Sequence, residues 1–214
     1  MIRSIIITAL VLTSLLALPV WGNPLERNFA FEVDYGAANS TPLPLTDTGK
    51  KIYGSSIVTF PSGVHFLWAS PLGIDVGISY QTSTWISSSS YAGSGGIYSD
   101  PKIKFDSISP FIAFPVFPTG EKGIIKGLFI QAGPSLNALT ETLNFNSHPE
   151  DFTSSAISLD LALGFRTVNK EVLSFTARAN VSIPLVSDLK RSLTGLGTNG
   201  MATLSVHAGA CLSF

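Results

Sequence analysis

The chain has 214 residues and a formal net charge of −1, and only 13% of its residues are charged whereas 45% are hydrophobic. This length suits one domain, and the near-zero charge offers no electrostatic footprint for nucleic acid, so we exclude nucleic-acid binding. Average soluble proteins carry roughly 25% charged residues, so the composition indicates a membrane environment.

The N-terminal residues 1–22 have the pattern of a cleaved signal peptide. Arg3 precedes an apolar stretch from Ile5 to Leu18, which ends at Pro19. An uncleaved anchor is the alternative, but the apolar stretch is short and stops at a proline. After it, no apolar run approaches the roughly 18 residues that a spanning helix needs. The single cysteine, Cys211, allows no disulfide within the chain and no lipid attachment near the cleavage site.

From Phe29 onward, apolar residues alternate with small or polar ones, which is typical of strands with two different faces. The parity of the fourth strand is blurred between Ile108 and Phe111, and we interpret this as a β-bulge. Eight such strands are predicted, near residues 29–37, 58–68, 74–81, 102–117, 124–140, 157–166, 173–183 and 202–214.

Alternation alone also fits a soluble barrel with the faces inverted, but the connections favour a membrane barrel. Short turns near residues 70–73, 118–123 and 168–171 alternate with longer segments near 39–54, 84–101, 142–154 and 186–199. Short turns at one end and long loops at the other are typical of outer-membrane barrels. We therefore predict an all-β fold for residues 23–214: an eight-stranded antiparallel up-and-down transmembrane β-barrel with both termini in the periplasm.

Aromatic residues of the apolar face gather toward the predicted short-turn end, where they would form an interfacial girdle. Its predicted members are Phe29, Trp68, Phe117, Phe165, Phe175 and Phe214. Toward the opposite end, Tyr80, Trp85 and Phe105 are candidates for an outer girdle.

The polar face carries charges of both signs, which we expect to pair inside the lumen. The predicted lumen network consists of Glu32, Asp34, Asp75, Lys104, Asp106, Asp160, Arg166, Arg178 and His207. Such a network either plugs the barrel or lines a narrow pore, because eight strands leave an interior just wide enough for side chains.

No motif predicts catalysis, a metal or a cofactor. The histidines, His65, His148 and His207, lack the spacing that zinc needs, and no serine can be paired with a base. The GxGxxG match at 195–200 lacks the flanking strand and helix of a dinucleotide site, so we interpret it as a flexible loop. The loop at 83–100 carries Tyr91 and other aromatics on a serine- and glycine-rich background. It is either a contact surface for a host molecule or a disordered loop.

Residues 24–214 resemble the broad outer-membrane β-barrel family that includes OmpA-type domains and small opacity-type porins. The resemblance rests on the signal peptide, the alternating strands, the segment Phe129–Pro134 and the ending Ala210–Phe214. It implies that Phe214 is recognised by the barrel-assembly machinery. We expect a monomer among outer-membrane lipids of a bacterium, with no cofactor and no enzymatic activity. The expected role is structural or surface interaction through the extracellular loops, and the alternative is a narrow porin-like channel.

Overall fold

The computed structural model describes residues 29–41, 45–69, 74–93, 95–116, 127–167, 173–187, 192–196 and 201–213. The predicted signal peptide at 1–22 and the three predicted short turns lie outside these ranges. Among the described residues, no helix has both the length and the apolar character needed to cross a membrane.

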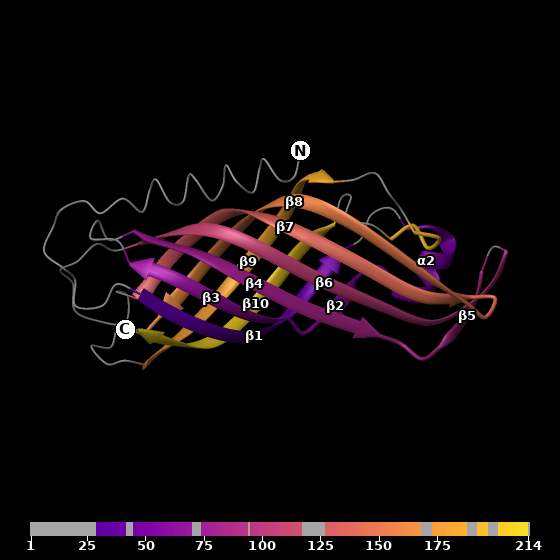
Figure 1. Ribbon diagram of the computed structural model, residues 1–214, viewed down its shortest axis with the longest axis horizontal. Helices are drawn as coiled ribbons and strands as arrows, with labels where there is room; N and C mark the ends of the chain where they lie inside the picture. Colours follow the sequence, from indigo (N-terminus) through magenta and orange to yellow (C-terminus); the bar gives the residue numbers. More distant parts are fainter. Residues whose placement is uncertain are drawn as a thin grey trace, which may run out of the picture.

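The strands form one antiparallel sheet that closes on itself, because β10 pairs with β1 (Figure 1). β2 and β3 share one place in the barrel wall, separated by Phe60 and Pro61, and β5 only extends the edge of β6. Eight places result, joined in chain order, so the predicted barrel is confirmed. The elements are β1 (Phe29–Thr41), α2 (Asp47–Tyr53), β2 (Ile57–Thr59), β3 (Ser62–Ala69), β4 (Asp75–Ile86), β5 (Ser90–Gly93), β6 (Gly96–Pro115), β7 (Leu128–Phe145), β8 (His148–Arg166), β9 (Leu173–Ser187) and β10 (Ala202–Ser213).

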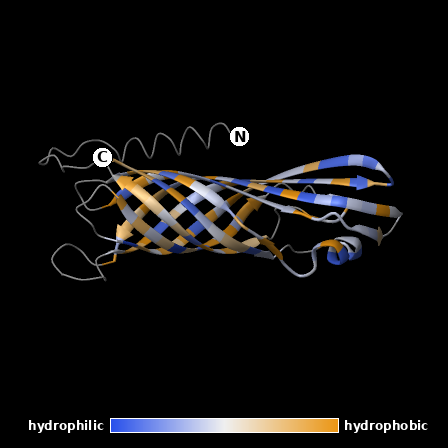
Figure 2. Cartoon of the chain, turned by 90° about the horizontal axis from the view of Figure 1, so that it is seen from below, coloured by the Kyte–Doolittle hydropathy of each residue, from blue (hydrophilic) through white to orange (hydrophobic). Residues whose placement is uncertain are grey.

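The outward face of the wall is an apolar band. Large side chains stay exposed there, such as Leu163 at 57% and Phe175 at 60%, which would be unfavourable in water. In β1 the outward apolar positions run from Phe29 to Ala37, which matches the roughly 9–11 residues of a tilted membrane-spanning strand. Figure 2 shows the hydrophobic colour along the barrel wall. The band therefore faces lipid.

Three strands project beyond this band. β6, β7 and β8 have 20, 18 and 19 residues, whereas β1, β9 and β10 have 13, 15 and 12. We call the end where β1 begins and β10 ends the terminal end, and the projecting end the cap end. β7 and β8 join through Asn146 and Ser147, whose φ angles of 48° and 68° suit a tight two-residue hairpin turn. The long loop predicted at 142–154 is thus wrong, because both strands continue through it.

The β-bulge lies nearer the start of β6 than predicted. The register against β7 shifts between Ser99 and Lys102, where Asp100 has a φ of 52°, whereas the pairing with β4 is continuous through Ile108 and Phe111. The blurred parity arises instead because Phe111 faces inward and is only 2% exposed. The shift at Asp100 lets residues on both sides of it contribute buried side chains to the cap end.

The cap end has its own apolar core, formed where α2 and residues 192–196 pack against the projecting strands. Thr46 caps α2 by accepting from the Gly49 amide, and its hydroxyl donates to the Thr194 carbonyl at 2.7 Å. The described part of the loop predicted at 195–200 is irregular as expected but packed rather than flexible, since Leu196 is fully buried. We call this cluster the cap core: Leu45, Ile52, Tyr53, Ile57, Tyr98, Ile103, Leu139, Leu143, Leu196 and Met201.

Candidate functional site

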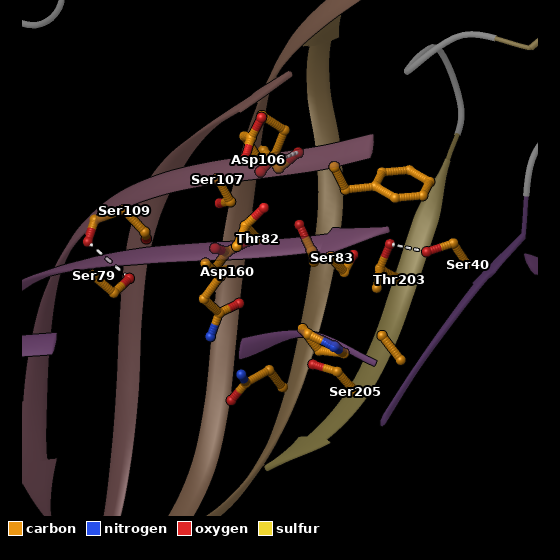
Figure 3. Close-up of a pocket in the computed structure, with 18 of the residues that line it drawn as sticks. Ser40, Ser79, Thr82, Ser83, Asp106, Ser107, Ser109, Asp160, Thr203 and Ser205 are labelled. Carbon is orange, nitrogen blue, oxygen red and sulfur yellow. Dashed lines mark hydrogen bonds between the residues drawn. The ribbon is translucent and has the colours of Figure 1, made fainter. Parts of the chain in front are cut away.

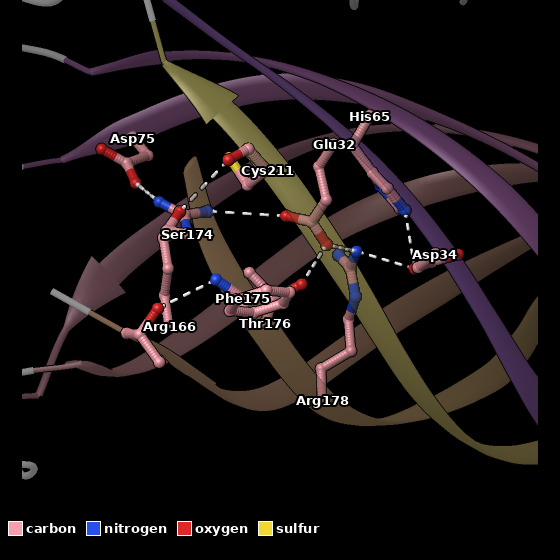
Figure 4. A network of polar contacts seen from close by, with 11 residues as sticks. Glu32, Asp34, His65, Asp75, Arg166, Ser174, Phe175, Thr176, Arg178 and Cys211 are labelled. Carbon is pink, nitrogen blue, oxygen red and sulfur yellow. Dashed lines mark hydrogen bonds and ion pairs between the residues drawn. The ribbon is translucent and has the colours of Figure 1, made fainter. Parts of the chain in front are cut away.

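The deepest part of the lumen holds an ion-pair centre. Because successive side chains of a strand point to opposite faces, Glu32 and Asp34 of β1 and Arg178 of β9 all point inward. Their side chains are at most 3% exposed. One guanidinium nitrogen, Nη2 of Arg178, pairs with Glu32 Oε1 and lies 2.7 Å from Asp34 Oδ2 (Figure 4). Buried carboxylates need such partners, because an unpaired buried charge costs several kcal/mol.

Neutral and basic side chains complete the contacts of this centre. His65 Nε2 lies 2.9 Å from Asp34 Oδ2, and His207 Nδ1 lies 3.5 Å from Asp34 Oδ1. The hydroxyl of Thr176 donates to Glu32 Oε1 at 2.8 Å. The two carboxylates of β1 are therefore held by side chains from β3, β9 and β10.

A second pair extends the network to the terminal end. Arg166 Nη1 lies 3.2 Å from Asp75 Oδ2, and its Nη2 lies 3.8 Å from Glu32 Oε2. The Arg166 guanidinium also lies over the ring of Phe129, 5.5 Å from its centroid. Arg166 and Asp75 are about one-quarter exposed, so this pair is close to the opening. We call the two pairs together the lumen network.

The opposite side of the lumen is apolar at the same level. Phe111 and Phe129 point inward from β6 and β7 and pack with Leu67 and Ala113. The ring of Phe111 lies against that of His65, with centroids 6.4 Å apart. Side chains from opposite walls meet, as expected inside so narrow a barrel. The terminal half of the lumen is thus filled partly by charge and partly by aromatic rings.

The structure brings together six of the nine residues predicted for the network: Glu32, Asp34, Asp75, Arg166, Arg178 and His207. Asp160 also faces inward but accepts from the Ser135 hydroxyl at 2.9 Å, apart from the ion pairs. The inclusion of Lys104 and Asp106 is wrong. They lie on the outward face of β6 and pair with each other at 2.8 Å.

His65 and Thr176 were missed as members of the network. Both occupy inward positions of their strands, and His65 stands between the outward Val64 and Phe66. That parity was a usable signal for His65. Glu32, Asp34 and His65 also place ligand-type atoms within 4.8 Å of one another, but the Arg178 guanidinium contacts both carboxylates and supplies the positive charge there.

Between the lumen network and the cap core lies a polar chamber of about 120 Å³ (Figure 3). His65 and Arg178 line it from the network, and Met201 lines it from the cap core. The Ser40 and Thr203 hydroxyls lie 2.9 Å apart in its wall. Asn180 Oδ1 is buried without a hydrogen-bond partner among the described residues.

One carboxyl group is buried inside the cap. Glu141 is 1% exposed and accepts hydrogen bonds at Oε1 from the hydroxyls of Tyr53 and Thr194, the latter at 2.7 Å. Its Oε2 has no hydrogen-bond partner among the described residues. It lies beyond Ala138, the last apolar outward residue of β7, and is therefore outside the lipid-facing band. Burial raises the pKa of the Glu141 carboxyl, and burial together with this carboxyl raises the pKa of Tyr53.

Four residues of the predicted girdle lie on the outward face at the terminal end: Phe29, Trp68, Phe165 and Phe175. Phe117 and Phe214 lie outside the described residues, so the assembly signal at Phe214 stays a prediction. Of the three residues predicted for the outer girdle, only Tyr80 points outward. Trp85 and Phe105 pack against the cap core, so their assignment to an outer girdle is wrong.

No family model matches the chain, and no curated protein matches it significantly. Solved structures do resemble it. Neisserial surface protein A aligns with a TM-score of 0.54 at 11% identity, covering 87% of this chain and 97% of that one. Ail, the attachment invasion locus protein of Yersinia pestis, solved in complex with the heparin analogue sucrose octasulfate, aligns with a TM-score of 0.56 at 10% identity. That alignment covers 89% of this chain and 100% of that one. With the closed sheet and the lipid-facing band, this likeness identifies the fold as that of the small eight-stranded outer-membrane β-barrels.

Proposed function

We propose that the protein is a closed barrel of the bacterial outer membrane whose projecting cap end acts in surface interaction. The terminal end faces the periplasm, because the long strands project at the other end and long extensions are extracellular in outer-membrane barrels. The cap core carries this proposal. It holds α2 and residues 192–196 on the projecting strands as one packed unit. A packed unit offers a partner a defined surface at a lower ordering cost than mobile loops.

The filled lumen supports a role outside the pore. The Arg178 ion pairs occupy one side of the terminal half, and Phe111 and Phe129 occupy the other. Ail, solved with a heparin analogue, shares this fold, which makes polyanionic surface ligands a reasonable first class to test.

The test removes the tip of the β7–β8 hairpin and leaves the barrel wall intact. Residues 144–149 are replaced by Asn-Gly, which joins the paired residues Leu143 and Glu150 by a two-residue turn. We expect bacteria displaying this variant to attach less to epithelial monolayers and heparin-coated surfaces than the wild type. The variant should still show heat-modifiable migration on detergent gels. Unchanged attachment to both surfaces, with the barrel folded, would contradict the proposal.

The polar chamber favours a second candidate, a narrow channel for water or small solutes. Planar-bilayer recordings of the refolded protein distinguish the two. The closed barrel predicts no discrete openings, and openings in the wild type that change size in Arg178→Gln would establish the channel instead.

A further inference from the structure

We propose that the outward face of β6 just above the lipid-facing band binds a phosphate group of an outer-leaflet glycolipid through Lys102 and Lys104. The proposal rests on the orientation proposed above, with the cap end outside. Binding of surface ligands by the hairpin tips plays no part in it.

The position of the two lysines follows from the alternation along β6. Its outward positions are apolar from Phe114 to Ile108 and then change to Asp106, Lys104 and Lys102. The outward face also becomes polar on the neighbouring strands, from Thr82 on β4 and from Thr140 on β7, although β4 carries the exposed Ile86 beyond Thr84. In register, Lys104 lies between Thr84 and Thr140, and Lys102 lies between Ile86 and Thr142. The lysines therefore stand where the hydrocarbon ends and the headgroups begin.

Tyr80 marks the same boundary from β4. It is 40% exposed on the outward face, and its hydroxyl donates to Asp106 Oδ1 at 2.9 Å. An aromatic ring toward lipid with its hydroxyl toward the polar side is typical of a membrane interface. Tyr80 and Asp106 thereby fix the level at which the cationic positions start.

The charge at this site is unbalanced. Asp106 pairs with Lys104 at 2.8 Å, and no acidic group lies within ion-pair distance of the exposed Lys102 in the part of the chain that the structure describes. In that same part, these two lysines are the only cationic residues on the outer wall. Arg166 and Arg178 point into the lumen, and the remaining pair, Lys50 and Lys51, lies on α2.

A phosphate fits this arrangement better than a neutral headgroup. Lysine side chains reach along an apolar surface and hold their ammonium groups at the headgroup level. Juxtamembrane lysines are attracted to anionic lipid, each by an amount that corresponds to a roughly five-fold change in affinity. The neighbouring hydroxyls of Thr84, Thr140 and Thr142 add donors for phosphate oxygens around the two cations.

The experiment titrates lipopolysaccharide into the full protein refolded in phosphatidylcholine nanodiscs. The variant is Lys102→Gln/Lys104→Gln, and the matched control is Lys50→Gln/Lys51→Gln, which removes the same charge from α2. We expect the variant to bind lipopolysaccharide roughly 25-fold more weakly and the control to match the wild type. Enzymatically dephosphorylated lipopolysaccharide should bind the wild type and the variant equally weakly.

Three outcomes would overturn the proposal: equal affinity of wild type and variant, an equal loss in the α2 control, or undiminished binding of the dephosphorylated lipid. A loss seen with phosphatidylglycerol but not with lipopolysaccharide would also overturn it, because the lysines would then face the phospholipid leaflet. That result would contradict the proposed orientation as well, whereas the other three leave the attachment assay of the cap end unaffected. Heat-modifiable migration of each variant shows that the barrel is folded in every comparison.

Discussion

The buried carboxyl of Glu141 predicts that the cap is held more tightly in acid than in base. Its pKa in the folded cap is raised above the ordinary 4.5, because burial disfavours the charged form. Between the ordinary and the raised pKa, the Glu141 carboxyl therefore stays protonated in the closed cap and is ionised in the opened cap. The contribution of the protonated Glu141 to the stability of the cap is complete below about pH 4.5. It is lost as pH rises through the raised pKa, at about 1.4 kcal/mol per pKa unit.

Two substitutions separate the charge from the hydrogen bonds. Glu141→Gln keeps an oxygen that can accept from Tyr53 and Thr194 and cannot ionise, so its cap should lose this pH dependence. Glu141→Ala leaves both buried hydroxyls without their acceptor. At about 1–3 kcal/mol for each of the two unsatisfied hydroxyls, the cap should lose roughly 2–6 kcal/mol.

Fluorescence of Trp85 measures the opening of the cap directly, because the centroid of its ring lies 5.3 Å from that of Tyr53 inside the cap. In a protein of residues 23–214 that carries Trp68→Phe, Trp85 is the sole tryptophan. Urea titrations at several pH values between about 4 and 9 then give the stability of the cap for wild type and Glu141→Gln. Parallel pH dependence in the two proteins would refute the assignment of the effect to Glu141.

Three further predictions concern the barrel. Arg178→Gln leaves two buried carboxylates without their guanidinium and should lower the free energy of unfolding in urea by about 3–5 kcal/mol. The control Lys50→Gln changes an exposed side chain and should cost almost nothing. Equal unfolding midpoints of the two variants would contradict the ion-pair geometry. Gly36→Ala would place a Cβ 2.2 Å from the Val206 carbonyl oxygen, so the refolded fraction on a detergent gel should fall. The control is Ser62→Ala on the outward face. Equal refolding yields of the two variants would count against this close approach. Cys211 is fully buried and should react with a maleimide only after heat unfolding; rapid labelling of the native barrel would show that its inward packing is wrong.

The fold was predictable within the lipid-facing band, because apolar side chains there point outward to lipid and small or polar side chains point inward to the lumen. In β8, for example, Leu161 and Leu163 face lipid, and Ala162 and Gly164 face the lumen. The closed order of eight strands follows from that pattern together with short connections.

Beyond the band, the same rule reverses, and this explains the errors on β6 and β4. Once the outer face meets water and headgroups, it becomes polar, and the inner face becomes apolar because the cap core fills it. Lys104 and Asp106 were therefore assigned inward, and Phe105 and Trp85 outward, whereas the structure shows the opposite. The sequence carries no mark of the height at which this reversal begins, since the height depends on how far neighbouring strands project.

Pairing between the ends of the chain sets a condition on assembly. β1 and β10 match over twelve positions, from Ala30 with Ser213 to Thr41 with Ala202, so the two edges that meet lie far apart in the sequence. Until β10 is in place, β1 and β9 each expose a row of unpaired backbone groups that hydrocarbon cannot satisfy. Glu32 and Arg178 sit on either side of the same seam, and β10 lies between their strands. A chain shortened within β10 would therefore leave both the seam and the deepest ion pair unmade, and only the finished chain can be released into lipid as a stable cylinder.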